Sequence, residues 1–275
     1  MYVVHAFMPL SVDQLSVHIH PDRVAMGRAA AVWAHTHIKA CVAFRGSARV
    51  ILASAPSQDD FCVALAGLAV AEPAFWARVV AFHMDEYVGL ARIHPQSFSS
   101  YLREHFFHRV RVAEFHPIRG DAPDPETEAV RYAKLLASAP IDLIGLGIGE
   151  NGHVAFNDPP IADFDDPVAV KVVELDRVCR QQQVNDGCFA TIEAVPRLAL
   201  SITLPVFARA SMLSCHVPTV RKAAAVLATL TGPVAASCPA TVLRLHPNAA
   251  LHLDPAAASL LPAEMLAAAR VTESG

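Results

Sequence analysis

Five side chains that can hydrogen-bond or exchange protons lie within nine residues of one another. They are Glu150, Asn151, His153, Asn157 and Asp158, in the glycine-rich stretch GLGIGENGHVAFNDPP. A histidine exchanges protons near neutral pH, and a nearby carboxylate can orient its ring and fix its tautomer. Glycines let the backbone approach a small ligand, which makes Gly149 and Gly152 candidate substrate-binding positions. The stretch therefore predicts a catalytic loop centred on His153.

A second acidic motif, Asp85-Glu86 in HMDEY, ends an apolar segment elsewhere in the chain. Neighbouring residues of a strand point to opposite faces, so we expect only one of these carboxylates to enter a cleft. A carboxylate at the end of a strand, beside a histidine loop, can serve as a proton-transfer base. Both Asp85 and Glu86 are therefore catalytic candidates.

The glycines of the first motif also allow a different interpretation. Gly147, Gly149 and Gly152 have the G-x-G-x-x-G spacing of a dinucleotide-binding turn. Such a turn must open a helix whose N-terminus holds the pyrophosphate. Pro159 and Pro160 stop any helix after one turn. We therefore expect no nucleotide cofactor at this loop.

The elements that must position these residues follow from the apolar patterns. Helices are expected at residues 22–44, from 57 onward, at 94–110, 125–138 and 219–230, and in the alanine-rich C-terminal region; strands are expected at 48–54, 79–87, 141–149, 168–176, 211–217, 240–246 and 250–254. Strands that alternate with helices are typical of a parallel sheet covered on both faces. Ligands of such sheets bind at the carboxyl ends of the strands, where both motifs lie.

Composition narrows the class of protein. Of the 275 residues, 53% are hydrophobic and 17% are charged, which favours one large α/β domain over residues 1–275. The net charge of −4, without a basic block, predicts neither a nucleic-acid nor a membrane partner. The N-terminus has no signal-peptide pattern, and the six scattered cysteines favour reduced thiols in the cytoplasm. The pair His105 and His108 is more typical of a helix surface than of a metal site, so no metal is assigned.

Several blocks resemble the glucosamine-6-phosphate deaminase/isomerase family. In order, they are MDEYVGL, HPQSFSSYL, GIGENGHVAFNDP, RKAAAV and LRLHP, and the resemblance covers roughly Ala48 to Leu261. It implies a Rossmann-like three-layer α/β/α fold with a mostly parallel central sheet and no cofactor. The implied reaction opens the ring of an amino-sugar phosphate, moves a proton between C1 and C2, and releases ammonia. A small sugar phosphate is the implied ligand, and a homo-oligomer is the expected assembly.

The resemblance also implies a role for particular residues. Asp85 matches the base that moves the C2 proton, and His153 matches the histidine that assists ring opening. Asp158 and Asn151 match the acids that support this histidine, and Lys222 matches a lysine that contacts the substrate phosphate. A carboxylate and a histidine suffice for enediol-type chemistry.

The chain departs from the family pattern at the phosphate end. Residues 54–58 read S-A-P-S-Q where the family resembles T-G-S-T-P, although the hydroxyls of Ser54 and Ser57 could still bind an anion. The family's phosphate-binding arginine is missing from residues 186–189, and Arg177 or Arg180 could replace it. These departures predict a divergent member.

Two alternatives remain open at this point. A 6-phosphogluconolactonase-like hydrolase would use His153 to activate water and would depend less on Asp85. A sugar-phosphate-binding protein without turnover would fit the altered relay, in which Asn151 carries no charge and Asp158 is one methylene shorter than glutamate.

Overall fold

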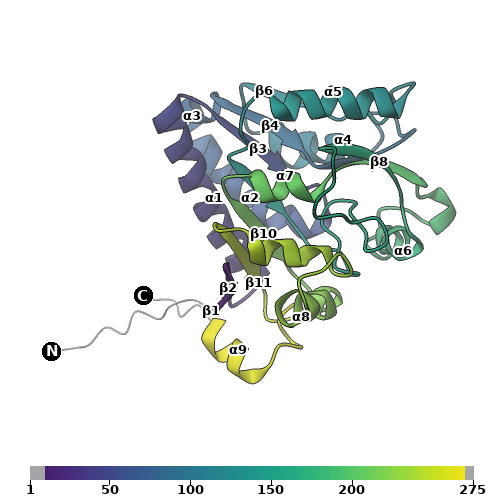
Figure 1. The fold of residues 1–275 in the computed structure, drawn as a ribbon. Helices are drawn as coiled ribbons and strands as arrows, with labels where there is room; N and C mark the ends of the chain where they lie inside the picture. Colours follow the sequence, from purple (N-terminus) through teal and green to yellow (C-terminus); the bar gives the residue numbers. More distant parts are fainter. Residues whose placement is uncertain (1–9, 270–275) are drawn as a thin grey trace.

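The computed structural model describes residues 10–269, so predictions made for residues 1–9 and 270–275 lie outside it. Figure 1 shows helices packed on both sides of a central sheet. Its eight strands follow the order β1-β2-β11-β10-β7-β3-β4-β6, and every neighbouring pair except β1–β2 is parallel. The predicted Rossmann-like α/β/α class with a mostly parallel sheet is confirmed.

The strands of the central sheet are β1 (Leu10–Val12), β2 (Leu15–Ile19), β3 (Ala48–Leu52), β4 (Val79–His83), β6 (Glu114–His116), β7 (Leu143–Leu146), β10 (Leu213–Val217) and β11 (Ala249–Leu253). The helices are α1 (Arg23–Arg45), α2 (Asp59–Ala71), α3 (Pro73–Trp76), α4 (Phe98–Leu102), α5 (Pro125–Ala137), α6 (Arg177–Asn185), α7 (Leu204–Arg209), α8 (Ala223–Thr231) and α9 (Ala263–Ala269). A π-helical turn, Arg103–Phe107, continues α4, and 3₁₀ turns span Pro56–Gln58, Ile192–Ala194, Val220–Lys222 and Pro239–Leu245.

The side chains of the central strands divide between two apolar layers. In β3, Val50 and Leu52 pack with α1 and α2, whereas Ile51 packs on the opposite face with α5, α7 and the Pro239–Leu245 turn. This alternation is the period of a strand buried on both faces. None of the helices between residues 10 and 269 is long and apolar enough to cross a bilayer.

A small antiparallel sheet stands apart from the central one. It consists of β5 (Asp85–Tyr87), β9 (Leu198–Ile202) and β8 (Val170–Glu174). The prediction of one continuous strand over 79–87 is therefore wrong in one respect: the chain leaves β4 at Met84 and pairs β5 with β9 instead. This bend places the Asp85-Glu86 pair at the end of the central sheet.

Other local predictions need correction. Residues 240–246 were expected to form a strand but form a 3₁₀ helix opened by Pro239, which cannot donate to a strand ladder. The helix expected from residue 57 onward begins at Asp59, and its N-cap is Gln58. The helix expected at 94–110 begins only after Ser97, and the sequence interpretation contained no helix at α6.

The connections that follow the neighbouring strands β3 and β7 run to opposite sides of the sheet. From β3 the chain passes through α2 to its neighbour β4, whereas after β7 it reaches β10 on the opposite side. Such a switch point leaves a crevice outside the carboxyl ends of the strands. The loops after β3 and β7, residues 53–58 and 147–158, meet there.

Thr219 lies in strained backbone between β10 and α8. Its φ of 80° and ψ of 148° belong to a region that β-branched residues rarely adopt. The Asp254 carboxylate holds it there by accepting from the Thr219 N–H at 3.0 and 3.1 Å. Such strain costs about 1–3 kcal/mol and persists only where the surroundings enforce it.

Replacing Thr219 with glycine should therefore raise the free energy of unfolding by about 1 kcal/mol, because relief of strain exceeds the entropic cost of a glycine. Thermal denaturation of Thr219→Gly beside the wild type measures the change. A lower melting temperature for the variant would contradict this account of Thr219.

Candidate active site

A cavity of ≈ 370 Å³ opens at the switch point. Predicted residues from four separate segments line it: Ser54 and Ser57 after β3, Asp85 after β4, Gly149 and His153 after β7, and Lys222 after β10. These segments follow neighbouring strands of the sheet, so the parallel topology alone brings their side chains together.

The His153 imidazole is fixed by two neighbours of its own loop. Its Nδ1 lies 2.7 Å from Asn151 Oδ1 and 3.1 Å from Asp158 Oδ1. The Asn151 amide also donates to Asp158 Oδ1 at 2.9 Å. Because both partners of Nδ1 are acceptors, Nδ1 carries the proton, and Nε2 is left as the basic nitrogen.

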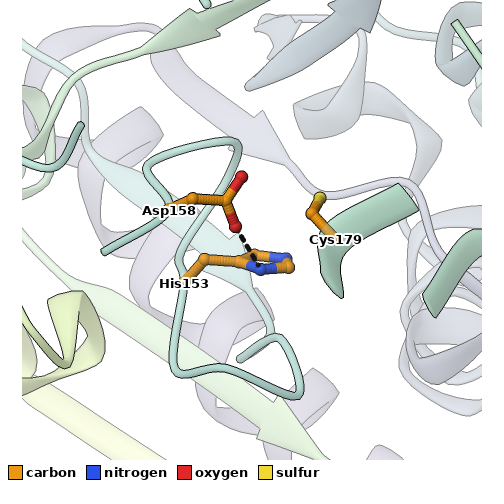
Figure 2. A group of neighbouring side chains, drawn as sticks. All are labelled: His153, Asp158 and Cys179. Atoms are coloured by element: carbon orange, nitrogen blue, oxygen red, sulfur yellow. Dashed lines mark ion pairs between the residues drawn. The ribbon is translucent and has the colours of Figure 1, made fainter. Parts of the chain in front are cut away.

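Asp158 and Cys179 complete the surroundings of this ring, as Figure 2 shows. Burial works to raise the pKa of the Asp158 carboxyl, but hydrogen bonds from His153 and Asn151 outweigh it and lower that pKa below its ordinary value. The Asp158 carboxylate therefore stays charged beside the imidazole.

Cys179 is a site residue that the sequence interpretation missed. It lies on α6, and its sulfur, a carboxylate oxygen of Asp158 and a ring nitrogen of His153 are all within 4.8 Å of one another. Burial raises the pKa of the Cys179 thiol well above its usual range, and the charges of Asp158 and Asp176 add to the rise. The neutral thiol thus closes the buried side of the histidine without adding a charge.

The glycine spacing of the loop has a steric cause. A Cβ on Gly149 would lie 2.1 Å from Cε1 of the His153 ring, and one on Gly147 would lie 2.9 Å from Nε2 of Gln58. Gly152 has a φ of 85° and does not line the cavity. Gly147 and Gly149 therefore make room for side chains, and Gly152 makes a left-handed turn. The expected contact of Gly152 with the substrate is not found.

No helix follows the glycine motif in the described chain up to residue 169. The prolines act as expected, and the segment is an irregular loop closed by a bridge between Val154 and Asn157. The segment from the glycine motif to residue 169 therefore has no helix N-terminus that could hold a pyrophosphate.

Asp85 and Glu86 point to opposite sides, as expected for neighbours in a strand. Asp85 lines the cavity, and its carboxylate has no hydrogen-bond partner among residues 10–269. Burial raises the pKa of Asp85 well above its ordinary value, and the charge of Glu86 adds to the rise. A buried carboxylate with a raised pKa is a stronger base than an exposed one.

Glu86 does not line the cavity, which corrects its assignment as a catalytic candidate. Its carboxylate accepts four hydrogen bonds, from the Ser97 hydroxyl and from the backbone N–H groups of Tyr87, Phe98 and Ser99. These bonds fasten the beginning of α4 to β5. The role of Glu86 is therefore to fix the wall of the cavity.

Lys222 is the single lysine or arginine among the described residues that line the cavity. It is buried, and this burial lowers the pKa of its ammonium group, while Asp186 and Glu150 oppose the change. The strained Thr219 and the 3₁₀ turn after it aim this side chain at the site.

Arg180, proposed as a substitute for the missing arginine, lies elsewhere. Its guanidinium donates to the carbonyl oxygens of Ile192 and Val195 and does not line the cavity. The end of α6 instead contributes three polar residues that the sequence interpretation missed: Gln182, Gln183 and Asp186. Their only signal was the polar run RQQQVND, which has too few apolar residues to show a helical period.

The chain matches the family model described as glucosamine-6-phosphate isomerases/6-phosphogluconolactonase over residues 21–252. It is 38% identical over 183 residues to the glucosamine-6-phosphate deaminase of Exiguobacterium sp., covering 66% of this chain and 70% of that one. The enzyme of the same name from Listeria monocytogenes is also 38% identical over 183 residues, covering 66% and 76%.

Solved structures agree with these matches. A monomeric glucosamine-6-phosphate deaminase superposes with a TM-score of 0.81 at 27% identity, covering 90% of this chain and 99% of that one. The 6-phosphogluconolactonase of Trypanosoma brucei has the same fold, with a TM-score of 0.70 at 18% identity and coverage of 94% and 100%.

Gly149→Ala should lower kcat about 100-fold with little loss of folding, because the new methyl group displaces the His153 ring. Steady-state kinetics and circular dichroism measure the two effects. Gly67→Ala is the matched control, since a Cβ at Gly67, within α2, meets nothing within 4 Å. Unchanged kcat in Gly149→Ala would contradict the packing of the histidine against this glycine.

Asp85→Asn should raise the melting temperature at pH 7. A carboxyl with a raised folded-state pKa destabilises the fold as pH rises above its ordinary pKa of 3.8 and toward the raised value. The gap between variant and wild type should therefore widen from pH 4 to pH 7. Asp121→Asn, at an exposed acid beside Arg92, is the control for the loss of one charge. A gap that stays constant with pH would show that Asp85 is not perturbed.

Proposed function

This chain belongs to the family of glucosamine-6-phosphate isomerases and 6-phosphogluconolactonases, and we propose that it is an amino-sugar deaminase/isomerase of the glucosamine-6-phosphate deaminase type. The observation that carries the proposal is that Asp85 and His153 face one cavity, one as an unpaired carboxylate and the other as an oriented imidazole. Deaminases supply the most similar curated relatives described above, and a sugar phosphate as substrate is consistent with the family.

The proposed reaction begins at the sugar ring. His153 Nε2 takes the proton of the O1 hydroxyl and returns it to O5, which opens the ring to the aldehyde. The Nδ1 proton, held between Asn151 and Asp158, keeps Nε2 available in both directions. Stabilisation of the imidazolium by Asp158 makes the first transfer easier.

Asp85 then removes the C2 proton and delivers it to C1. The amine loses one N–H proton and O1 gains one, so the C2–N bond becomes an imine as C1 becomes an alcohol carbon. The aldehyde is thereby reduced while C2 is oxidised within one molecule. Water hydrolyses the imine to a ketone and ammonia. Carbon–hydrogen acidity next to a carbonyl is sufficient for this step, and the internal redox balance requires no external electron carrier.

Six free cysteines support a reducing compartment for the enzyme. All of them lie among the described residues, and none is paired with another. Structural thiols of this kind are typical of the cytoplasm, and we propose that location.

A combined assay tests the proposed reaction against the lactonase alternative. Wild type should release ammonia and ketose from an amino sugar, and Asp85→Asn should lower kcat by at least about 100-fold because the C2 base is lost. Hydrolysis of 6-phosphogluconolactone is measured in parallel on both proteins. Lactone turnover that survives Asp85→Asn, with no ammonia from either glucosamine or its 6-phosphate, would establish the lactonase instead.

A further inference from the structure

Carboxylates predominate among the charged side chains of the cavity. Asp59, Glu104 and Asp186 line it with Asp85, and Lys222 is the single lysine or arginine that lines it in the described chain. Arg221, outside the lining, lies 3.4 Å from the Asp186 carboxylate. A phosphate monoester carries a charge of about −1.5 to −2 at neutral pH. A site for such a dianion normally presents an excess of cations and N–H donors.

Three positions after β3 have no free backbone N–H for an anion. Pro56 has no N–H, the N–H of Gln58 donates to Ala55 O, and that of Asp59 donates to Pro56 O. The first turn of α2 also contains Asp59 and Asp60. Acids at a helix N-terminus already occupy its favourable potential and repel a second anion.

Asp186 lines the same cavity as Lys222. The Asp186 charge opposes the lowering of the Lys222 pKa. Burial raises the pKa of the nearby Cys188 thiol to about 11, and the charges of Asp186 and Asp59 add to the rise, so both acids lie close to Cys188. The positive charge of the Lys222 ammonium group is therefore partly balanced by acidic side chains before any ligand binds.

Gln183 supplies a neutral polar contact beside these charges. It is 8% exposed, lines the cavity, and its side-chain amide has no hydrogen-bond partner within residues 10–269. The neighbouring Gln182 already has a hydrogen-bond partner, because its Oε1 accepts from the N–H of Glu150. The Gln183 amide can therefore both donate to and accept from a ligand in the cavity.

From this arrangement we propose that Gln183, Asp186 and Lys222 select an amino sugar whose far end is an uncharged hydroxyl rather than a phosphate. This inference rests on the proposed deaminase/isomerase reaction and names its substrate class. A hydroxyl can donate to the Asp186 carboxylate and accept from the Lys222 ammonium or the Gln183 amide, whereas a phosphate can only accept. The carboxylates Asp59 and Glu104 add repulsion against the phosphate.

Ammonia release from free glucosamine and from glucosamine-6-phosphate tests the proposal. Wild type should show a kcat/KM at least about tenfold higher for the unphosphorylated sugar. Asp186→Asn should move the ratio about tenfold toward the phosphate, and Asp186→Arg should move it further. Asp121→Asn removes the same charge from the surface and should leave the ratio unchanged.

Preference of the wild type for the phosphorylated sugar, or a ratio that Asp186→Asn does not move, would overturn the assignment and leave the deaminase reaction intact. Binding measured by calorimetry separates the selectivity for the unphosphorylated sugar from the deaminase reaction itself. If neither sugar releases ammonia, the proposed reaction fails; the selectivity then stands only if free glucosamine binds more tightly than its 6-phosphate and Asp186→Asn narrows the difference.

Discussion

The position of one imidazole constrains the whole of the site. His153 lies directly against the Cα of Gly149, and its Nδ1 contacts Asn151 and Asp158 from the same loop. A loop that must close around a ring in this way cannot become a helix, and the switch point after β7 provides the room for an irregular segment. The G-x-G-x-x-G spacing is therefore a consequence of packing the His153 ring against the loop. The proposed proton transfer depends on the same packing.

Much of the fold follows from the sequence because its cause is local. Apolar patterns predict β3, β7, β10, α1 and α5, and both helices begin at N-caps, Asp22 and Asp124, that accept N–H bonds from the first turn. Of two errors, one has a non-local cause and the other a local one. Residues 79–87 read as one strand because both halves are buried, yet β5 pairs with β9, more than a hundred residues away. Residues 240–246 alternate like a strand but coil after Pro239.

The candidate site divides in the same manner. Short motifs predict Asp85, Asn151, His153 and Asp158 as site residues, and the structure brings Asp85 and His153 to one cavity with Asn151 and Asp158 bonded to the histidine. Cys179, Gln183 and Asp186 reach the cavity from α6, whose polar residues face the site and leave no apolar stripe to reveal a helix. The prediction for Glu86 differs from its place in the structure because its chemistry is that of a catalytic acid, while three of its four donors come from residues 97–99, which only the tertiary structure brings near.

Helix α6 is a short element that serves two parts of the candidate site. Cys179, near its beginning, lies beside the Asp158–His153 pair, and Gln183 and Asp186, near and just past its end, line the cavity together with Lys222. The same helix is bonded to the histidine loop, since Gln182 accepts from the N–H of Glu150. A change in α6 that alters the choice of substrate therefore also alters the surroundings of the proton-transferring histidine, so specificity and catalysis are coupled through one short helix.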